Sequence, residues 1–236
     1  MGVPERDEYL QRGQEAAEEL SEALGVAGHT LAGFESILDF GCGSARVLPH
    51  VSAMTEARCA GCDVDAEAIE WASEHHPALR WTVSPAEPPL PYPSHSFDLV
   101  YSISVLSHLS ESSQDRWLSE LFRLLRPRGV VLLTVHGRHA FEEFRTERVT
   151  TRWAPRGAFA RGPLEPGEFV FVPYVRSVWN RRDLPGVAAD YGLAFHDPDY
   201  VRTHWSKRFE VLAVLEQGMT DWQDIVVCTR SGAVGS

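Results

Sequence analysis

The sequence predicts an α/β protein with a doubly wound, mostly parallel sheet. Short apolar runs typical of strands alternate with amphipathic segments typical of helices between residues 36 and 135, as in sheets whose parallel strands are joined by helical crossovers. The first run, residues 37–40, ends in a Gly-x-Gly turn, and an acid, Asp63, follows the second run about 20 residues after that turn. This spacing is typical of sheets that bind a nucleotide-like cofactor at their carboxyl edge.

Length, charge and cysteine content limit the function classes. The 236 residues are 44% hydrophobic, enough for one domain with a sizeable core. The net charge of −11 argues against a nucleic-acid partner, because phosphate binding requires a basic face. Residues 1–24 are polar and acid-rich and no long apolar run occurs, so we expect no signal peptide, no membrane partner and a cytoplasmic location. The cysteines lack a second CxxC pair or a histidine cluster, which predicts free buried thiols and no metal site: Cys42, Cys59, Cys62 and Cys228.

The amphipathic segment at residues 5–24 predicts a helix that ends at Gly25. We expect this helix to lie across the cofactor cleft. From there Tyr9 and Arg12 could reach the carboxylate end of a cofactor, although a solvated helix face explains both residues equally well.

The glycine turn indicates which cofactor is bound. A helix that begins after such a turn points its first backbone N–H groups into the crevice, and Gly41 and Gly43 allow the backbone to approach a ligand closely. Arg46 stands where the dinucleotide pattern requires a small residue. Asp39 would repel a pyrophosphate but attract an ammonium group. The predicted cofactor is therefore S-adenosylmethionine, which carries an ammonium group and a ribose but no phosphate; a nicotinamide dinucleotide is the weaker alternative.

Two acids among the strands and helices between residues 36 and 135 have different predicted roles. Asp63 is placed to bind the ribose diol, because Asp65 already supplies the N-cap of the helix that follows. Asp98 precedes an apolar strand and is predicted to be a structural capping acid. A turn at residues 127–129 is predicted to lead into the last strand of this group. Strands are predicted at residues 36–40, 58–65, 80–84, 96–101 and 130–135, and helices at residues 44–54, 66–75 and 112–126.

A proline-rich loop at residues 85–93 is predicted to wall in the adenine ring, since proline fixes the backbone and excludes helix and central strand. Ser84, Ala86 and Glu87 are its candidate contacts.

Four segments resemble a class I S-adenosylmethionine-dependent methyltransferase: ILDFGCGSARVL, GCDVDAEAIEWA, EPPLPYPSHSFDLVYSISVLSHLS and LFRLLRPRGVVLLTVHG. They most resemble bacterial small-molecule methyltransferases of the type 11/25 group. The resemblance implies a Rossmann-like, seven-stranded sheet whose last strand is antiparallel. Relatives often carry Asp or Asn where this chain has Ser84-Pro85, so we expect backbone groups to bind the adenine. The cofactor contacts that the matching positions imply are Asp39, Gly41, Cys42, Gly43, Asp63, Val64, Ala86 and Ser102.

The sequence after residue 137 is less regular. Residues 138–146 are predicted to be helical, and residues 147–185 combine prolines with many aromatic residues, which favours an ordered lid. Arginines exceed acids between residues 145 and 182, which predicts either a rim for an anionic or carrier-bound acceptor or a solvated face. A helix at residues 198–208 and strands at 209–215 and 223–229 complete the pattern. We expect one domain, with a helical cap at residues 1–34, a core at 35–137, a lid insertion after the fifth strand at 138–196 and closing elements at 197–230; the last residues, 231–236, are expected to be frayed.

Methyl transfer is an in-line displacement, so its catalysis depends mainly on holding donor and acceptor in position. A hydroxyl or protonated amine acceptor also needs a base, and His108 and His136 are candidates because both follow strands at the carboxyl edge. Packing against the cofactor or core explains both histidines as well. Substrate contacts are predicted at Trp179, Tyr191 and His196, the last also a weaker candidate base.

The function predicted from these observations is methyl transfer from S-adenosylmethionine to a small molecule such as a sugar or secondary metabolite, with oxygen preferred over nitrogen or carbon. A nicotinamide-dependent oxidoreductase is disfavoured, because Lys207 is the only lysine and no Tyr-x-x-x-Lys pair occurs. A non-catalytic module that binds S-adenosylmethionine is the third candidate. The protein is expected to be a monomer or a homodimer.

Overall fold

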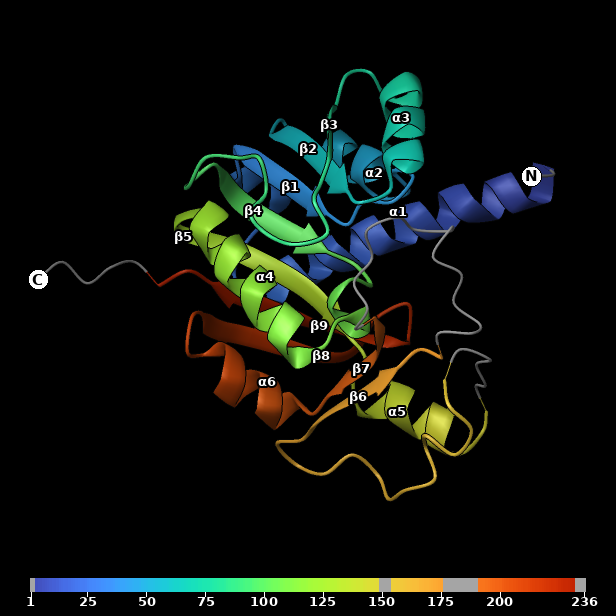
Figure 1. Cartoon of the computed structure of the whole chain (residues 1–236). Helices are drawn as coiled ribbons and strands as arrows, with labels where there is room; N and C mark the ends of the chain where they lie inside the picture. The colour runs from blue at the N-terminus through green and yellow to red at the C-terminus, as the bar shows by residue number, and fades with distance from the viewer. Residues whose placement is uncertain (1–2, 149–153, 176–190, 232–236) are drawn as a thin grey trace, which may run out of the picture.

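A computed structural model of the chain describes residues 3–148, 154–175 and 191–231. Its main sheet has seven strands in the order β3-β2-β1-β4-β5-β9-β8 (Figure 1). The neighbours from β3 to β5 pair in parallel, and β9 runs antiparallel to both β5 and β8. The predicted seven-stranded, mostly parallel sheet with an antiparallel last strand is therefore confirmed. The strands are β1 Ser36–Phe40, β2 Arg58–Asp63, β3 Arg80–Val83, β4 Phe97–Ser102, β5 Leu125–Val135, β8 Glu210–Met219 and β9 Gln223–Thr229.

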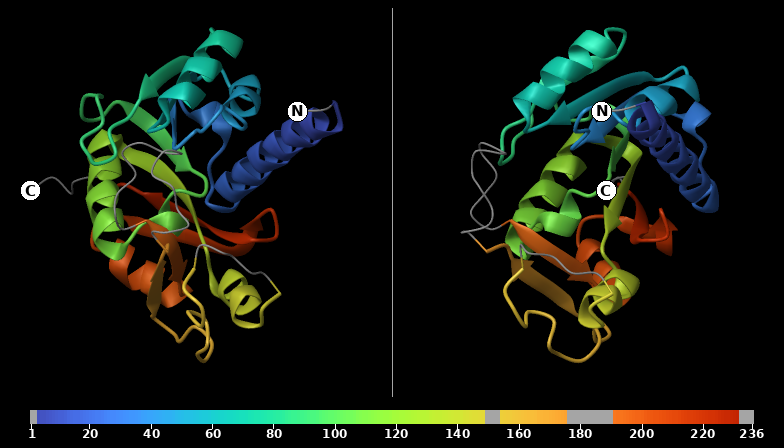
Figure 2. Two further views of the ribbon diagram at one scale, coloured as in Figure 1. Left: turned by 45° about the vertical axis from the view of Figure 1, so that its right-hand side comes forward. Right: turned by 90° about the vertical axis from the view of Figure 1, so that its right-hand side faces the viewer.

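Helices cover both faces of the sheet. Successive side chains of a central strand such as β1 are all buried, and they point alternately to the two faces. Leu38 and Phe40 pack in one cluster with α4 and α6, whereas Ile37 packs in a second cluster with α1 and α2. Figure 2 shows α1 as a long helix along one side of the sheet. The helices are α1 Val3–Val26, α2 Leu48–Ala53, α3 Ala66–His75, α4 Glu111–Leu124, α5 Arg138–Arg145 and α6 Pro198–Trp205, with short 3-10 turns at Leu31–Gly33 (η1) and Leu106–His108 (η2).

Several element boundaries differ from the prediction. Strand β2 ends at Asp63 rather than at residue 65, α4 ends at Leu124 rather than at 126, and β8 extends to Met219 rather than to 215. The helix expected at residues 44–54 is only α2, because Ala45 has a left-handed φ of 60° and residues 44–47 form turns. Strand β5 begins at Leu125 and includes the expected turn at 127–129, where Arg128 is left-handed at 66°. The helix expected at 198–208 ends at Trp205.

Two strands were not predicted. β6 (Phe169–Pro173) and β7 (Gly192–His196) form a separate antiparallel sheet. Isolated bridges join Tyr191 to Leu109 and Phe195 to His136, so this small sheet is anchored to the carboxyl edge of the main one. It packs with α5 in an aromatic cluster that includes Phe141, Phe144, Tyr174 and Phe195.

The predicted capping acids are confirmed. The side chain of Asp65 accepts hydrogen bonds from the N–H groups of Glu67 and Ala68 at the start of α3. Asp98 Oδ2 accepts from the N–H of Ser36 at 3.0 Å, and Arg126 pairs with the same carboxylate. The four cysteines are free and buried, as expected.

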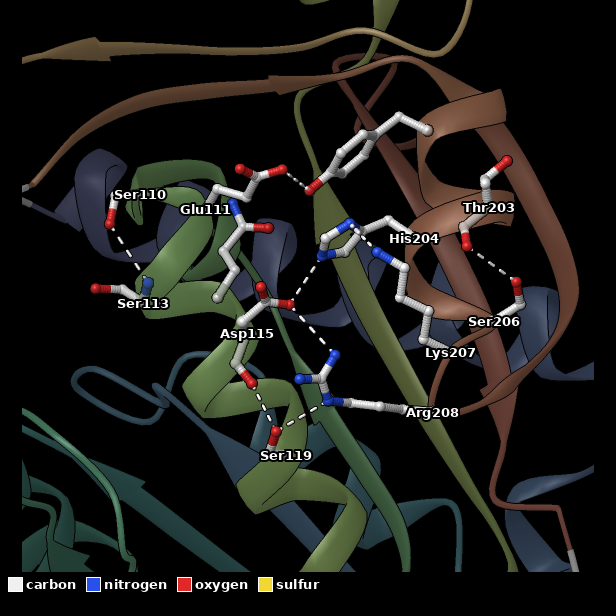
Figure 3. Close-up of polar contacts among 12 residues, drawn as sticks. Ser110, Glu111, Ser113, Asp115, Ser119, Thr203, His204, Ser206, Lys207 and Arg208 are labelled. Atoms are coloured by element: carbon white, nitrogen blue, oxygen red, sulfur yellow. Dashed lines mark hydrogen bonds and ion pairs between the residues drawn. The ribbon is translucent and has the colours of Figure 1, made fainter.

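Helix α6 is tied to α4 by a polar network (Figure 3). Asp115 Oδ1 lies 2.8 Å from His204 Nε2 and 3.3 Å from Arg208 Nη1. Arg208 Nε also donates to Ser119 Oγ at 2.9 Å. These contacts fix α4, which forms one wall of the site described next. Within the described ranges, no helix has the length and apolarity needed to cross a membrane.

Candidate functional site

A cavity of about 420 Å³ opens at the carboxyl ends of four parallel strands, β1 to β4. This position is where open α/β sheets bind ligands, and the volume falls in the range of about 300–1,000 Å³ found for small-molecule sites. Its walls come from the loops after these strands, from α4 and from the residue before β7. The lining residues are Phe40, Gly41, Gly43, Ser44, Asp63, Val64, Asp65, Ala68, Ser84, Pro85, Ala86, Glu87, Ile103, Ser104, Val105, Leu109, Ser113, Trp117 and Tyr191.

The glycine turn forms the floor of the cavity. Gly41 and Gly43 have left-handed φ angles of 80° and 50°, which glycine adopts without strain. The N–H groups of Gly41 and Cys42 donate to the carbonyl of Cys62, so the turn is held against the end of β2. A Cβ on Gly41 would collide with Val105, whereas a Cβ on Gly43 would meet no described atom within 4 Å. The space beside Gly43 is therefore open to a ligand.

Asp63 lies in the cavity at the end of β2. Its Oδ2 accepts the Gly43 N–H at 2.7 Å, and its Oδ1 accepts the Asp65 N–H at 2.9 Å. A carboxylate has about four acceptor positions, so one on each oxygen remains for a ligand. This arrangement suits a diol, and it fits the ribose of S-adenosylmethionine.

The carboxylate of Asp39 does not line the cavity. The residue is 3% exposed, and the hydroxyl of Tyr101 donates to Asp39 Oδ2 at 2.9 Å. Burial raises the pKa of Asp39 to about 7. Asp39 therefore lies behind the glycine turn, and the direct cofactor contact expected of it is not found in this structure.

Two other predicted contacts are also behind the cavity wall. Cys42 and Ser102 are buried and absent from the lining residues. Burial raises the pKa of the Cys42 thiol above its usual range. Ser102 Oγ has no hydrogen-bond partner among the described residues.

Tyr9 reaches the cavity through another residue. Its hydroxyl donates to the Ser44 carbonyl at 3.0 Å and lies 2.8 Å from Ser44 Oγ, and Ser44 lines the cavity. Helix α1 lies close against this loop, because a Cβ on Gly13 would overlap the carbonyl of Arg46. Arg12 pairs with Glu8 on the exposed face of α1, which agrees with the solvated-face interpretation of Arg12.

The proline-rich loop lies beside Asp63, as expected of an adenine wall. Val64, Ser84, Ala86 and Glu87 all line this part of the cavity. The carboxylate of Glu87 is held by Arg116 of α4 through contacts of 2.8 and 3.1 Å.

The three candidate histidines do not line the cavity. His136 is 4% and His196 is 0% exposed, and burial lowers the pKa of each to about 3. His196 Nε2 contacts Gln114 Oε1 at 2.9 Å inside the core. Both side chains are therefore neutral packing groups in this arrangement.

His108 is nearer to the cavity than the other two, because it stacks on Tyr191, with ring centroids 5.4 Å apart, and Tyr191 is a lining residue. Its Nδ1 lies 3.0 Å from the Gly192 carbonyl and 2.9 Å from the Tyr174 hydroxyl. A carbonyl can only accept, so Nδ1 carries the proton when the ring is neutral. Burial lowers the pKa of His108, which favours that neutral form.

The predicted substrate region is described in part. Tyr191 lines the cavity, whereas Trp179 lies outside the described residues, as do residues 232–236 of the expected frayed end. Arg145, Arg148 and Arg161 pair with Glu142, Glu143 and Glu168. These three arginines support the solvated-face interpretation of the arginine excess.

Sequence reasoning missed several lining residues, among them Ser44, Ile103, Ser104, Val105 and Ser113. A usable signal existed for Ile103 to Val105, since they directly follow an apolar strand at the carboxyl edge. Ser113 carries no local signal, because its place depends on how α4 packs.

Comparison with known proteins agrees with this geometry. Residues 38–133 match the family model described as a methyltransferase domain. A tRNA (carboxymethyluridine(34)-5-O)-methyltransferase of Arabidopsis thaliana is 33% identical over 143 residues, which are 60% of this chain and 33% of that protein. Methyltransferase GfsG of Streptomyces halstedii is 28% identical over 52% of this chain and 44% of its own length. The chain thus spans less than half the length of these two relatives.

The fold is also found in a solved structure. An S-adenosylmethionine-dependent methyltransferase from Mesorhizobium loti superimposes with a TM-score of 0.57 and 15% identity, covering 89% of this chain and 96% of the other. At this identity the likeness shows a shared fold.

Proposed function

Because residues 38–133 are a methyltransferase domain of the class I, S-adenosylmethionine-dependent kind, we propose that the protein transfers a methyl group from this cofactor to a small molecule. An oxygen atom of a sugar or secondary metabolite is the proposed methyl acceptor. The observation that carries the proposal is the continuity of one cavity from Asp63 and Gly43 to Tyr191. Bound S-adenosylmethionine supplies an electrophilic methyl group, and the chain's own residues hold the two reactants in position.

A small acceptor is favoured over a nucleic acid by charge. The net charge is −11, and three arginines of the region after β5 are neutralised by ion pairs. The Arabidopsis relative is named for a reaction on tRNA, so tRNA remains the competing acceptor and belongs in the test. Methylation of nitrogen or carbon, and a role limited to cofactor binding, compete with this proposal as well. We further propose a cytoplasmic monomer or homodimer, with an anionic or carrier-bound acceptor as one option.

His108 is the proposed base. Its proton on Nδ1 leaves the Nε2 lone pair available, and its lowered pKa keeps this nitrogen unprotonated near neutral pH. The stack on Tyr191 brings the ring next to a lining residue. His136 and His196 are too deeply buried for this role.

The test uses S-adenosylmethionine labelled in its methyl group and three acceptor panels: phenols and sugars, small amines, and bulk tRNA. Label is expected on members of the hydroxyl panel, and His108→Gln should lower transfer at least about tenfold while leaving S-adenosylhomocysteine binding unchanged. Label on tRNA alone would contradict the small-molecule proposal. Cofactor binding without transfer to any panel would favour the non-catalytic module.

A further inference from the structure

Ser104 occupies an unusual position in the wall of the cavity. It lies two residues beyond the end of β4, lines the cavity and is exposed there. Its φ is 58°, in the left-handed region that non-glycine residues adopt at a cost. Backbone strain at a cavity wall persists only where surrounding contacts enforce it.

Buried side chains from two other strands supply those contacts. Thr134 Oγ1, on β5, accepts the Ser104 N–H at 2.8 Å. Gln223, the first residue of β9, brings Nε2 to 2.9 Å and Oε1 to 3.2 Å from Ser104 Oγ, and its Nε2 also lies 3.5 Å from Ser107 Oγ. Thr134 and Ser107 are fully buried and Gln223 is 4% exposed. The exposed hydroxyl is thus held by groups that do not themselves reach the cavity.

The hydrogen-bonding capacity of Ser104 is only partly used by these groups. A serine hydroxyl has one donor and two lone pairs. The Gln223 amide N–H donates to one lone pair of Ser104 Oγ, and the Ser104 hydroxyl donates a hydrogen bond to Gln223 Oε1. One lone pair is left for a ligand, so Ser104 presents a hydrogen-bond acceptor to the cavity.

The strand order places this group at the end where transfer occurs. Asp63 ends β2, the glycine turn follows β1, and Ser104 follows β4, the next strand in the sheet. With neighbouring strands about 4.8 Å apart, Ser104 lies about 10 Å along the sheet from Asp63. The predicted adenine wall follows β3, on the other side of Asp63, so a cofactor whose ribose is bound by Asp63 would extend its reactive end toward Ser104.

We propose that Ser104 orients the methyl acceptor by accepting a hydrogen bond from its nucleophilic O–H or N–H group before that proton passes to the base, and that Gln223 is the positioning residue that aims the Ser104 hydroxyl. The inference rests on the proposed methyltransferase function and narrows its substrate class. Hydroxyl and amine acceptors carry the required donor, whereas a carbon nucleophile does not.

Steady-state kinetics on a hydroxyl or amine acceptor that takes label in the panel test reports on this contact. Ser104→Ala is expected to raise the KM for that acceptor about two- to tenfold, as for a lost hydrogen bond between neutral groups, and to change S-adenosylhomocysteine binding, measured by calorimetry, less than about twofold. Gln223→Leu should raise the KM for the acceptor in the same direction.

Two control variants separate orientation from folding. Ser104→Gly removes the hydroxyl but relaxes the left-handed backbone, so it should behave as Ser104→Ala does. Ser52→Ala removes a hydroxyl on α2, outside the cavity lining, and should leave the KM for the acceptor unchanged. An unchanged KM for the acceptor in Ser104→Ala, with S-adenosylhomocysteine still bound, would overturn the inference alone. Failure of the wild-type protein to bind S-adenosylhomocysteine, or to label any acceptor panel, would overturn the proposed function, and the inference with it.

Discussion

Replacing Asp63 with alanine should remove most of the affinity for the cofactor. Its two oxygens each accept one backbone N–H, from Gly43 at 2.7 Å and from Asp65 at 2.9 Å. The remaining acceptor positions suit the two ribose hydroxyls. The Asp63→Ala variant loses the contacts to the ribose hydroxyls. It also leaves the N–H groups of Gly43 and Asp65 without this acceptor.

The magnitude follows from those contacts. A hydrogen bond to a charged group contributes about 1.5–3 kcal/mol, so two of them contribute about 3–6 kcal/mol. At about 1.4 kcal/mol for each factor of ten, the affinity for S-adenosylhomocysteine should fall at least about 100-fold. Asp63→Asn keeps one acceptor oxygen and should show a smaller loss.

The assay is isothermal titration calorimetry, with Asp65→Ala as the matched control. Asp65 also lines the cavity, but its carboxylate caps α3. Its loss should lower the free energy of unfolding by about 1 kcal/mol and leave the affinity within about threefold, well below the effect at Asp63. A folded Asp63→Ala protein that binds S-adenosylhomocysteine as the wild type does would refute the ribose assignment.

Two further predictions concern stability, each measured by urea unfolding. Gly13→Ala places a Cβ against the Arg46 carbonyl and should lower the free energy of unfolding by about 1–3 kcal/mol. Gly25→Ala, in the same helix with open space around it, should raise the free energy of unfolding by up to about 1 kcal/mol. Similar effects at both sites would mean that α1 does not pack on this loop. Because burial raises the pKa of Asp39 to about 7, the folded protein retains a proton that the unfolded chain releases above about pH 4, so this carboxyl lowers stability as the pH rises from 4 to 7. Asp39→Asn lacks that penalty, and its stability relative to wild type should increase across this window by up to about 4 kcal/mol; a pH-independent difference would contradict the buried carboxyl.

The elements predicted from sequence are those whose cause is local. A glycine turn after an apolar run, a carboxylate one residue before a helix and an acid at the end of the second strand all depend on neighbours along the chain. Accordingly, the turn at Gly41, the cap at Asp65 and the position of Asp63 in the cavity agree with the structure.

The features that sequence reasoning missed depend on partners far away in the chain. Asp39 is buried, and the hydrogen bond that its carboxylate accepts there comes from Tyr101, 62 residues later. Strand β6 has little alternation of its own and is recognised by its pairing with β7, about 20 residues further on. The role proposed for Ser104 depends on Gln223, 119 residues away. Such contacts become visible only when the sheet is assembled.

The central claim is that the cavity between Asp63 and Tyr191 binds S-adenosylmethionine. Calorimetric titration of the wild-type protein with S-adenosylhomocysteine and, separately, with NAD tests it most directly. We expect saturable binding of one S-adenosylhomocysteine per chain and no binding of NAD. Binding of NAD without binding of S-adenosylhomocysteine would contradict the claim.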